Sequence, residues 1–363
     1  MTHSFTFPVR SGHDHASVSL EECYLFTRQL HVLQRAGVPL LSSLQALQTQ
    51  VASASFRRVL VDVHHALLEG RKFSQALERH PAVFSPMFVS LIRVGEAGGL
   101  LDEVLKELSQ LLQWEMDLRH RLKDALQYPC IVLATLSVAL LIMAVFVLPR
   151  FGQMFQSFHI PLPLQTRILI VLSLFLARYG WLLALILIAA AIGWWRYLST
   201  PAGRFHWDTW KLHLPIVGPA VLQLSMSRFA RVTAALTHSG VPILETLALA
   251  SETTNNRYVQ IKLESVRSRI RAGESLATAL KREPLFPSVV VQMVATGEET
   301  GRLDELLHSV SDYYDDQVNY YVKRLITSLE PALLIVVGLG VLAMASAIFV
   351  PMWDLVKIFK QGR

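Results

Sequence analysis

The chain has 363 residues, of which 52% are hydrophobic and only 17% are charged, with a formal net charge of +6. This composition excludes a disordered chain, because the apolar residues are numerous enough to offset the conformational entropy lost on folding. It also argues against an ordinary soluble enzyme, since the charged fraction lies well below the usual ~25%. We therefore expect a protein embedded in a membrane.

Residues 1–20 are expected to form a polar tail. They include His13, Asp14 and His15 but no apolar run, so no cleavable signal peptide is expected. The two cysteines, Cys23 and Cys130, lie far apart in the sequence. That separation predicts two free thiols and no disulfide framework.

Residues 21–124 are expected to form a small helical bundle. Its clearest stripe of apolar residues at helical spacing comprises Phe56, Leu60, Val63 and Leu67. Such a stripe is typical of an amphipathic helix that packs on a core. Gly37-Val38-Pro39 predicts a tight corner, with a glycine ending one helix and a proline opening the next. No segment alternates polar and apolar residues over the length of a strand, so the expected fold class is all-α.

Three apolar segments follow in chain order. Residues 125–149 and 331–353 contain no charged residue, and each is long enough to cross a hydrocarbon core that needs about 20 residues. Residues 168–195 are interrupted by Arg178, which can snorkel toward an interface, and end near Trp194, which suits an aromatic belt. The sequence therefore predicts three transmembrane helices.

The last apolar segment is rich in small residues, namely Gly338, Gly340, Ala343, Ala345, Ser346 and Ala347. Small residues let helix backbones approach each other closely in lipid. Small residues also occur in transmembrane helices at positions that contact no other helix. The pattern therefore leaves open whether this helix contacts another one.

The second half of the chain repeats the first. At an offset of about 203 residues, these pairs match: Arg28 with Arg231, Gly37 with Gly240, Pro39 with Pro242, Gly95 with Gly297, Glu96 with Glu298, Gly99 with Gly301, and Pro129 with Pro331. The apolar stripe recurs as well, in Val259, Leu263, Val266 and Ile270. Each copy therefore comprises a helical bundle and the apolar segment that follows it.

The repeat predicts the topology. Two equivalent bundles should lie on one side of the membrane, and each leads into an equivalent outbound span, so the chain must return once between them. The expected order is a tail (1–20), a cytoplasmic bundle (21–124), a span (125–149), a short periplasmic loop (150–167), a returning span (168–195), a second cytoplasmic bundle (196–330), a span (331–353) and a periplasmic tail (354–363). Basic residues near the span ends lean slightly toward cytoplasmic bundles.

Motifs of catalysis and of cofactor binding are missing from the sequence. The segment from Gly297 to Gly301 lacks the lysine of a phosphate-binding loop, and the two cysteines lack the spacing of metal ligands. Lysine and arginine are spread along the chain instead of forming one stripe, which favours contacts with lipid headgroups over nucleic acid. We expect no enzyme activity, no cofactor and no metal.

Glu96 and Glu298 each follow a glycine and precede an Asp-Glu pair. Three interpretations stay open for this repeated acidic turn: helix capping, a solvated corner, or docking to a basic partner surface. The docking surface would extend over Asp102, Glu103, Glu107, Asp304 and Glu305. A cation-binding acidic cluster is a further alternative.

Proline-containing motifs stand before the first span, before the last span and at the entry to the second bundle: Tyr128-Pro129, Glu330-Pro331 and Leu214-Pro215-Ile216. Together with the two Gly-Glu-x-x-Gly turns, these motifs resemble the pattern of the type II secretion system F family, the inner-membrane platform proteins of type II secretion systems and type IV pili. The resemblance covers the chain from about Glu21 to its end.

The resemblance implies a non-enzymatic, homo-oligomeric scaffold in the bacterial inner membrane. Its implied partners are a cytoplasmic hexameric ATPase, pilin or pseudopilin subunits, other inner-membrane assembly components and membrane lipids. The alternative is a subunit of a membrane transporter or channel, although three transmembrane helices are few for lining a transport pathway. The residues expected to serve docking or structure are Arg28, Gly37, Pro39, Gly95, Glu96, Gly99, Tyr128, Pro129, Arg231, Gly240, Pro242, Gly297, Glu298, Gly301, Glu330 and Pro331.

Overall fold

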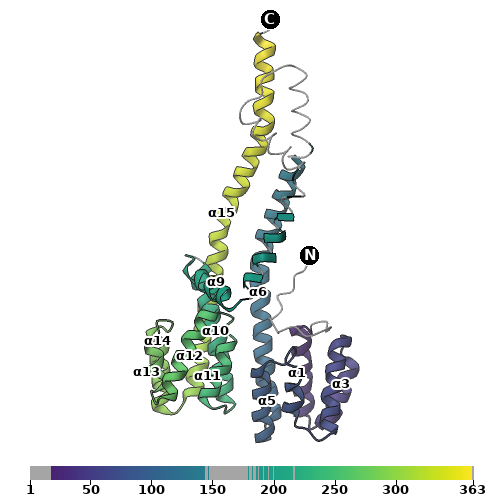
Figure 1. Ribbon diagram of the computed structural model, residues 1–363, viewed down its shortest axis with the longest axis vertical. Coiled ribbons are helices and arrows are strands. Elements are labelled where there is room, and N and C mark those ends of the chain that lie inside the picture. The colour runs from purple at the N-terminus through teal and green to yellow at the C-terminus, as the bar shows by residue number, and fades with distance from the viewer. Residues whose placement is uncertain are drawn as a thin grey trace. The chain divides into compact units, whose positions relative to one another are not determined.

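The structure is a computed structural model that describes residues 18–143, 146, 179, 182, 185–186, 188–190, 192–194, 196–198, 200–215 and 217–361. Every regular element among these residues is a helix, which confirms the all-α prediction for the part described (Figure 1). Most of the N-terminal tail, the loop 150–167, Arg178 and much of the span 168–195 lie outside the described residues. The chain divides into two compact units: Met1–Arg121 with Asp208–Tyr321, and Leu122–Trp207 with Val322–Arg363.

The first unit contains the helices of the first bundle up to Arg121 and those of the second bundle from Asp208 onward. The helices of the first bundle are α1 (Leu20–Arg35), α2 (Leu40–Gln50), α3 (Ala54–Leu68), α4 (Phe73–Glu78), α5 (Pro86–Gly98) and the beginning of α6 (Leu101–Ile142). Serines begin several of them: Ser19 and Glu22 form a capping box at α1, and the side chains of Ser53 and Ser85 accept from the first turns of α3 and α5. Each cap satisfies amide groups that a helix end otherwise leaves without a partner.

The second bundle repeats this order. Its helices are α9 (Pro201–His213), α10 (Val217–His238), α11 (Ile243–Glu252), α12 (Arg257–Arg271), α13 (Leu276–Lys281), α14 (Ser288–Thr300) and the beginning of α15 (Leu303–Gln361). By the repeat offset, α10 to α15 correspond to α1 to α6. Asn256 and Ser275 cap α12 and α13. The predicted duplication of the helical order is therefore present in the structure.

The apolar stripes predicted from spacing form the cores. Phe56, Leu60 and Val63 are fully buried, and their counterparts in the second repeat, Val259, Leu263 and Val266, are buried too. In the first bundle the ring of Phe56 meets that of Phe26 edge to face, with centroids 5.5 Å apart. Burying each such side chain contributes about 1.5–3 kcal/mol relative to leaving it in water.

The predicted glycine-proline corners are confirmed. Gly37 and Gly240 have left-handed backbone angles, with φ of 75° and 83°, which suit a residue that has no Cβ. Pro39 and Pro242 then stand as the N-cap residues of α2 and α11, one position earlier than the first helical residue. Each corner thus turns the chain from one helix into the next within four residues.

The second unit contains the continuations of α6 and α15, the two longest helices in Figure 1. Among the described residues, one stretch is long and apolar enough to cross a membrane, Leu303–Leu342 within α15. Within this unit a Cβ added to Gly340 would lie 2.9 Å from Cδ1 of Leu136, so α15 packs closely on α6 there. Of the alternatives for the small residues, helix contact therefore holds at Gly340. The count of three spans stays a prediction.

Candidate docking site

The two Gly-Glu-x-x-Gly turns connect α5 to α6 and α14 to α15. A Cβ at Gly95 would lie 2.9 Å from Cγ2 of Val104, and a Cβ at Gly297 would lie 3.0 Å from Cα of Leu303. Both glycines therefore allow a close approach of consecutive helices. Gly99 and Gly301 end their helices in the left-handed conformation, with φ of 71° and 69°.

The glutamates of these turns serve other helices. The Glu96 carboxylate accepts from the amides of Phe73 and Ser74, at 2.6 and 3.2 Å, and from the Ser74 hydroxyl at 2.7 Å. Glu298 accepts in the same way from the amides of Leu276 and Ala277, at 2.7 and 2.9 Å. Each carboxylate thus meets the free amides at the N-terminus of α4 or α13, where the helix dipole also favours negative charge. Of the three interpretations, helix capping describes these contacts.

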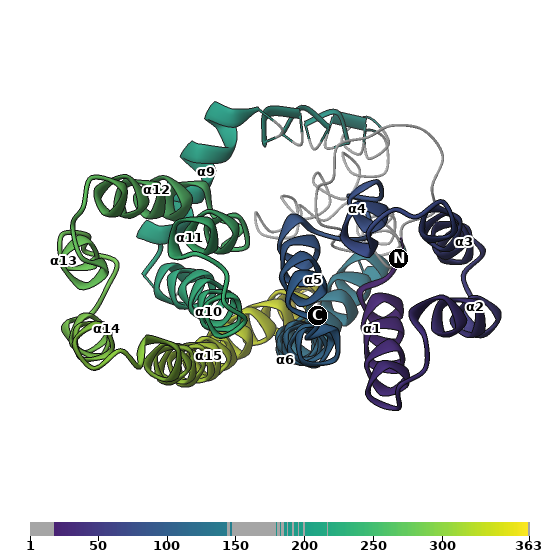
Figure 2. The ribbon, with the colours of Figure 1, turned by 90° about the horizontal axis from the view of Figure 1, so that it is seen from below.

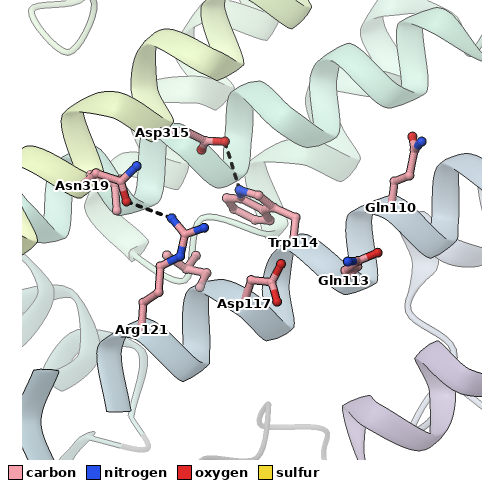
Figure 3. Close-up of a pocket in the computed structure, with 9 residues that line it drawn as sticks. Gln110, Gln113, Trp114, Asp117, Arg121, Asp315 and Asn319 are labelled. Atoms are coloured by element: carbon pink, nitrogen blue, oxygen red, sulfur yellow. Dashed lines mark hydrogen bonds between the residues drawn. The ribbon is translucent and has the colours of Figure 1, made fainter. Parts of the chain in front are cut away.

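Arg231 belongs to a polar cluster in which the two repeats meet. Its guanidinium pairs with Asp315 and, at 3.3 Å, with Asp312, and it lies 5.8 Å from the ring centroid of Trp114 in the first repeat. The Trp114 indole donates to Asp315 at 3.0 Å (Figure 3). Ser227 donates to the same carboxylate. The cluster joins α6, α10 and α15 by charge-assisted hydrogen bonds and an arginine-aromatic contact.

A second ion pair follows along the same contact. Arg228 of α10 donates twice to the carboxylate of Glu115 in α6, both times at 3.1 Å, and the two side chains are each 13% exposed. Arg119 adds a third donor at 2.9 Å. Nearer the other end of the bundle, the Ser90 hydroxyl of α5 donates to Glu245 of α11 at 2.9 Å. These contacts fix the two bundles to each other within one compact unit.

Arg28, the counterpart of Arg231, has different surroundings. It lies exposed on α1 and donates to the hydroxyl of Tyr24 at 3.3 Å. That hydroxyl in turn donates to Gln113, which replaces Asp315 of the second repeat. In the part of the chain that the structure describes, Arg28 forms no ion pair. The same arginine is therefore held by two carboxylates in the second repeat, whereas in the first it is exposed and bonds to the Tyr24 hydroxyl.

A polar hollow of about 380 Å³ opens beside the cluster. Its lining residues are Gln110, Gln113, Trp114, Asp117, Leu118, Arg121, Asp315, Val318 and Asn319. Arg121 points to Asn319 and donates to its side-chain oxygen at 3.0 Å (Figure 3). Among the described residues no group of His, Cys, Asp or Glu side chains has the arrangement of a metal site. The hollow offers hydrogen-bonding groups from α6 and α15.

The remaining predicted residues lie in the second unit. Tyr128 is exposed and Pro129 is buried, both inside α6, which runs through the proline without a break. Pro331 is exposed inside α15, and the side chain of Glu330 lies outside the described residues. The structure therefore groups Arg231 with partners that the sequence patterns did not indicate. The two Gly-Glu turns belong to the first unit, and the Tyr-Pro and Glu-Pro motifs belong to the second.

Sequence reasoning missed four residues of the contact between repeats: Trp114, Glu115, Arg228 and Asp315. The signal was present in the departures from the repeat, because the matching positions hold Asp316, Gln317, Leu25 and Gln113. At these positions the two copies of the repeat therefore have different surroundings.

Fold and contacts define a duplicated all-helical protein with a long apolar helix at its C-terminal end. The profile of the family described as type II secretion system (T2SS), protein F, matches residues 26–149 and 229–351. The chain therefore belongs to the type II secretion system protein F family.

Curated relatives share most of their length with the chain. The type IV pilus assembly protein PilC of Myxococcus xanthus is 33% identical over 336 residues, which cover 92% of this chain and 80% of the relative. PilC of Thermus thermophilus is 34% identical over 93% of this chain and 83% of its own length. The type II secretion system protein F of Xanthomonas campestris is 31% identical over 91% of this chain and 82% of its own.

Proposed function

We propose that the chain is the inner-membrane platform protein of a type IV pilus or type II secretion machine. Its family match covers both copies of the repeat, and its relatives bear the names of components of those two machines. A scaffold also suits the described residues, whose polar clusters link helices to one another. The described apolar segments support a membrane location, since α15 exposes Leu334, Ile335 and Leu339 along its length.

In this proposal both bundles face the cytoplasm and three spans anchor them. The repeat supports this topology, because α6 leaves the first bundle and α15 leaves the second at matching positions, each toward an apolar segment. Equivalent bundles with equivalent exits require one return crossing. Residues 168–195 would supply it.

The proposed activity is mechanical coupling. A cytoplasmic hexameric ATPase would displace the bundles, and the displacement would reach pilin or pseudopilin subunits at the membrane. The observation that carries this proposal is the continuity of α6 through Pro129 and of α15 through Pro331. A helix that does not break between bundle and apolar segment transmits tilt and rotation. A proline inside it removes one backbone donor and sets where it bends.

The experiment replaces Pro129 or Pro331 with alanine. Alanine restores the missing hydrogen bond and removes the proline ring that permits a kink, so pilus or secretion output should fall while membrane insertion and abundance stay normal. Thr135→Ala, also on the apolar part of α6, is the matched control and should keep normal output. Normal output in both proline variants would refute the coupling.

Partner identity is tested separately by affinity capture from detergent extracts. The proposed docking surface for the ATPase surrounds the acidic turns, where Asp304 and Glu305 remain 42% and 55% exposed beside the occupied Glu298. Asp304→Asn with Glu305→Gln should therefore reduce recovery of the ATPase. Unchanged recovery would place the docking surface elsewhere.

A further inference from the structure

The two repeats meet through different faces. Helices α10 and α11 of the second repeat contact α5 and α6 of the first, through Arg228 with Glu115 and through Glu245 with Ser90. Since α10 and α11 correspond to α1 and α2, and α5 and α6 correspond to α14 and α15, the contact is head-to-tail. Figure 2 shows the arrangement, with α5, α6, α10 and α11 between α2 and α3 on one side and α12 to α14 on the other.

Comparing the buried residues of corresponding helices shows which helix faces form the contact between the two repeats. In α10, buried residues follow one another almost without interruption from Ser225 to Leu236, whereas α1 buries only one stripe, from Cys23 to Leu30. In α5, Phe88 to Ile92 are all buried, whereas α14 buries only Val290, Val294 and Gly297. A helix buried on all sides lies between two packing surfaces. Accordingly α10 and α5 each pack against their own bundle and against the other repeat, whereas α1 and α14 pack against their own bundle alone.

In each repeat, one helix face is therefore exposed although the matching face of the other repeat is buried in the contact between the repeats. On α1 this face presents Leu25 and Val32, 44% and 58% exposed, on either side of the exposed Arg28. The matching residues of α10 are Arg228, Ala235 and Arg231, all held in the contact or buried. This exposed face of α1 thus corresponds to a face that α10 buries in the contact between the repeats.

The opposite free face lies on α14 and α15. It presents Val289 and Tyr320, 42% and 57% exposed, together with the exposed Asp316. Asp316 occupies the position of Trp114, the residue over which Arg231 lies in the first repeat. An arginine that repeats the placement of Arg231 would thus meet a carboxylate.

We propose that a second copy of this chain docks its α1 face on the α14–α15 face of the first, and so repeats between chains the contact that already joins the repeats within one chain. Arg28 would take the place of Arg231 and pair with Asp316, a complementary charge. Leu25 would take the place of Arg228 and lie beside Gln317, which holds the position of Glu115, so apolar packing would replace that ion pair. The exposed Val32, Val289 and Tyr320 would add apolar area to the contact. A head-to-tail contact that continues from copy to copy closes into a ring when its rotation permits. This inference concerns assembly alone and does not rest on the proposed coupling to an ATPase.

The test uses the full chain in its membrane with Cys23 and Cys130 replaced by serine. Two differently tagged copies are co-expressed, one carrying Arg28→Cys and the other Asp316→Cys, and a maleimide cross-linker is added. The proposal predicts a cross-linked dimer that contains both tags and depends on both cysteines. Ser90→Cys with Glu245→Cys in one chain is the positive control, because these side chains touch inside the monomer. Arg58→Cys with Lys281→Cys, on exposed positions of α3 and α13, is the negative control.

Three results would overturn the proposal. Arg28→Cys copies that cross-link to each other would show a two-fold contact of α1 with α1. No dimer beside a working positive control would leave the α1 face to a different protein. A dimer equally abundant in the negative control would reflect collision alone. Charge reversal gives an independent measurement: Arg28→Glu should shift the detergent-solubilised protein to a smaller species, and adding Asp316→Lys should restore the larger one.

Discussion

Replacing Gly95 with alanine tests why the Gly-Glu turn needs its first glycine. The new Cβ would lie 2.9 Å from Cγ2 and 3.0 Å from Cβ of Val104, and 3.3 Å from the carbonyl oxygen of Leu100. Val104 is itself buried and cannot turn away into solvent. Overpacking of this kind costs about 1–3 kcal/mol, from which alanine recovers about 0.5–1 kcal/mol by its helix propensity.

The expected net loss is therefore about 0.5–2 kcal/mol of unfolding free energy. At about 2–4 °C per kcal/mol this corresponds to a few degrees in Tm. Thermal unfolding of the detergent-solubilised chain, followed by tryptophan fluorescence, measures it. Gly98→Ala is the matched control, since its nearest contact is the Leu100 side chain at 3.8 Å. That variant should be as stable as the parent or slightly more stable.

A second substitution separates the clash from other causes. Val104→Ala alone leaves a small cavity, but in the Gly95→Ala background it removes the clashing atoms. The double variant should thus lose less stability than the sum of the single losses, with a coupling above ~0.5 kcal/mol. Additive losses, or an equal loss in Gly98→Ala, would refute this reading of the turn.

Further predictions concern a cap, a buried thiol and a contact between long helices. Glu298→Ala should lower the unfolding free energy by about 1–3 kcal/mol, because two amides of α13 lose their acceptor. The neighbouring Glu299→Ala should change the unfolding free energy little. Denaturant unfolding of the two variants measures the difference. Burial raises the pKa of the Cys23 thiol to about 12, above the ~8.5 of an unfolded chain, so its contribution to stability is complete below pH ~8.5 and is lost as the pH rises above that. The stability gap between the parent and Cys23→Ala should accordingly narrow between pH ~8 and ~10, and a gap constant with pH would refute this. Gly340→Leu should separate α15 from α6 and reduce cross-linking between cysteines placed on these helices, with Gly338→Leu as the control because a Cβ there meets nothing within 4 Å.

Much of the fold follows from local sequence signals. The spacing of Phe56, Leu60 and Val63 predicts a buried stripe, and Gly37-Val38-Pro39 predicts a corner, because both features depend on residues close in the chain. The internal repeat then extends each prediction to the second bundle. These are the cases in which helix periodicity and backbone preference decide the structure.

Partners distant in the chain could not be predicted in this way. Glu96 reaches amides of α4 more than twenty residues earlier, so its role as a cap depends on how two helices pack, although capping was among the interpretations that the sequence left open. The contact of Trp114 with Asp315 depends on which faces the two bundles share. Duplication alone does not choose between a two-fold and a head-to-tail arrangement, since both place like residues on like helices.

The placement of both bundles on one side of the membrane is the claim from which the proposed function follows. Reporter fusions measure it most directly, with alkaline phosphatase or a green fluorescent protein joined after Leu100 and, in a second pair of fusions, after Arg302. If both bundles are cytoplasmic, both positions should give fluorescence without phosphatase activity. Phosphatase activity at one position and fluorescence at the other would contradict it.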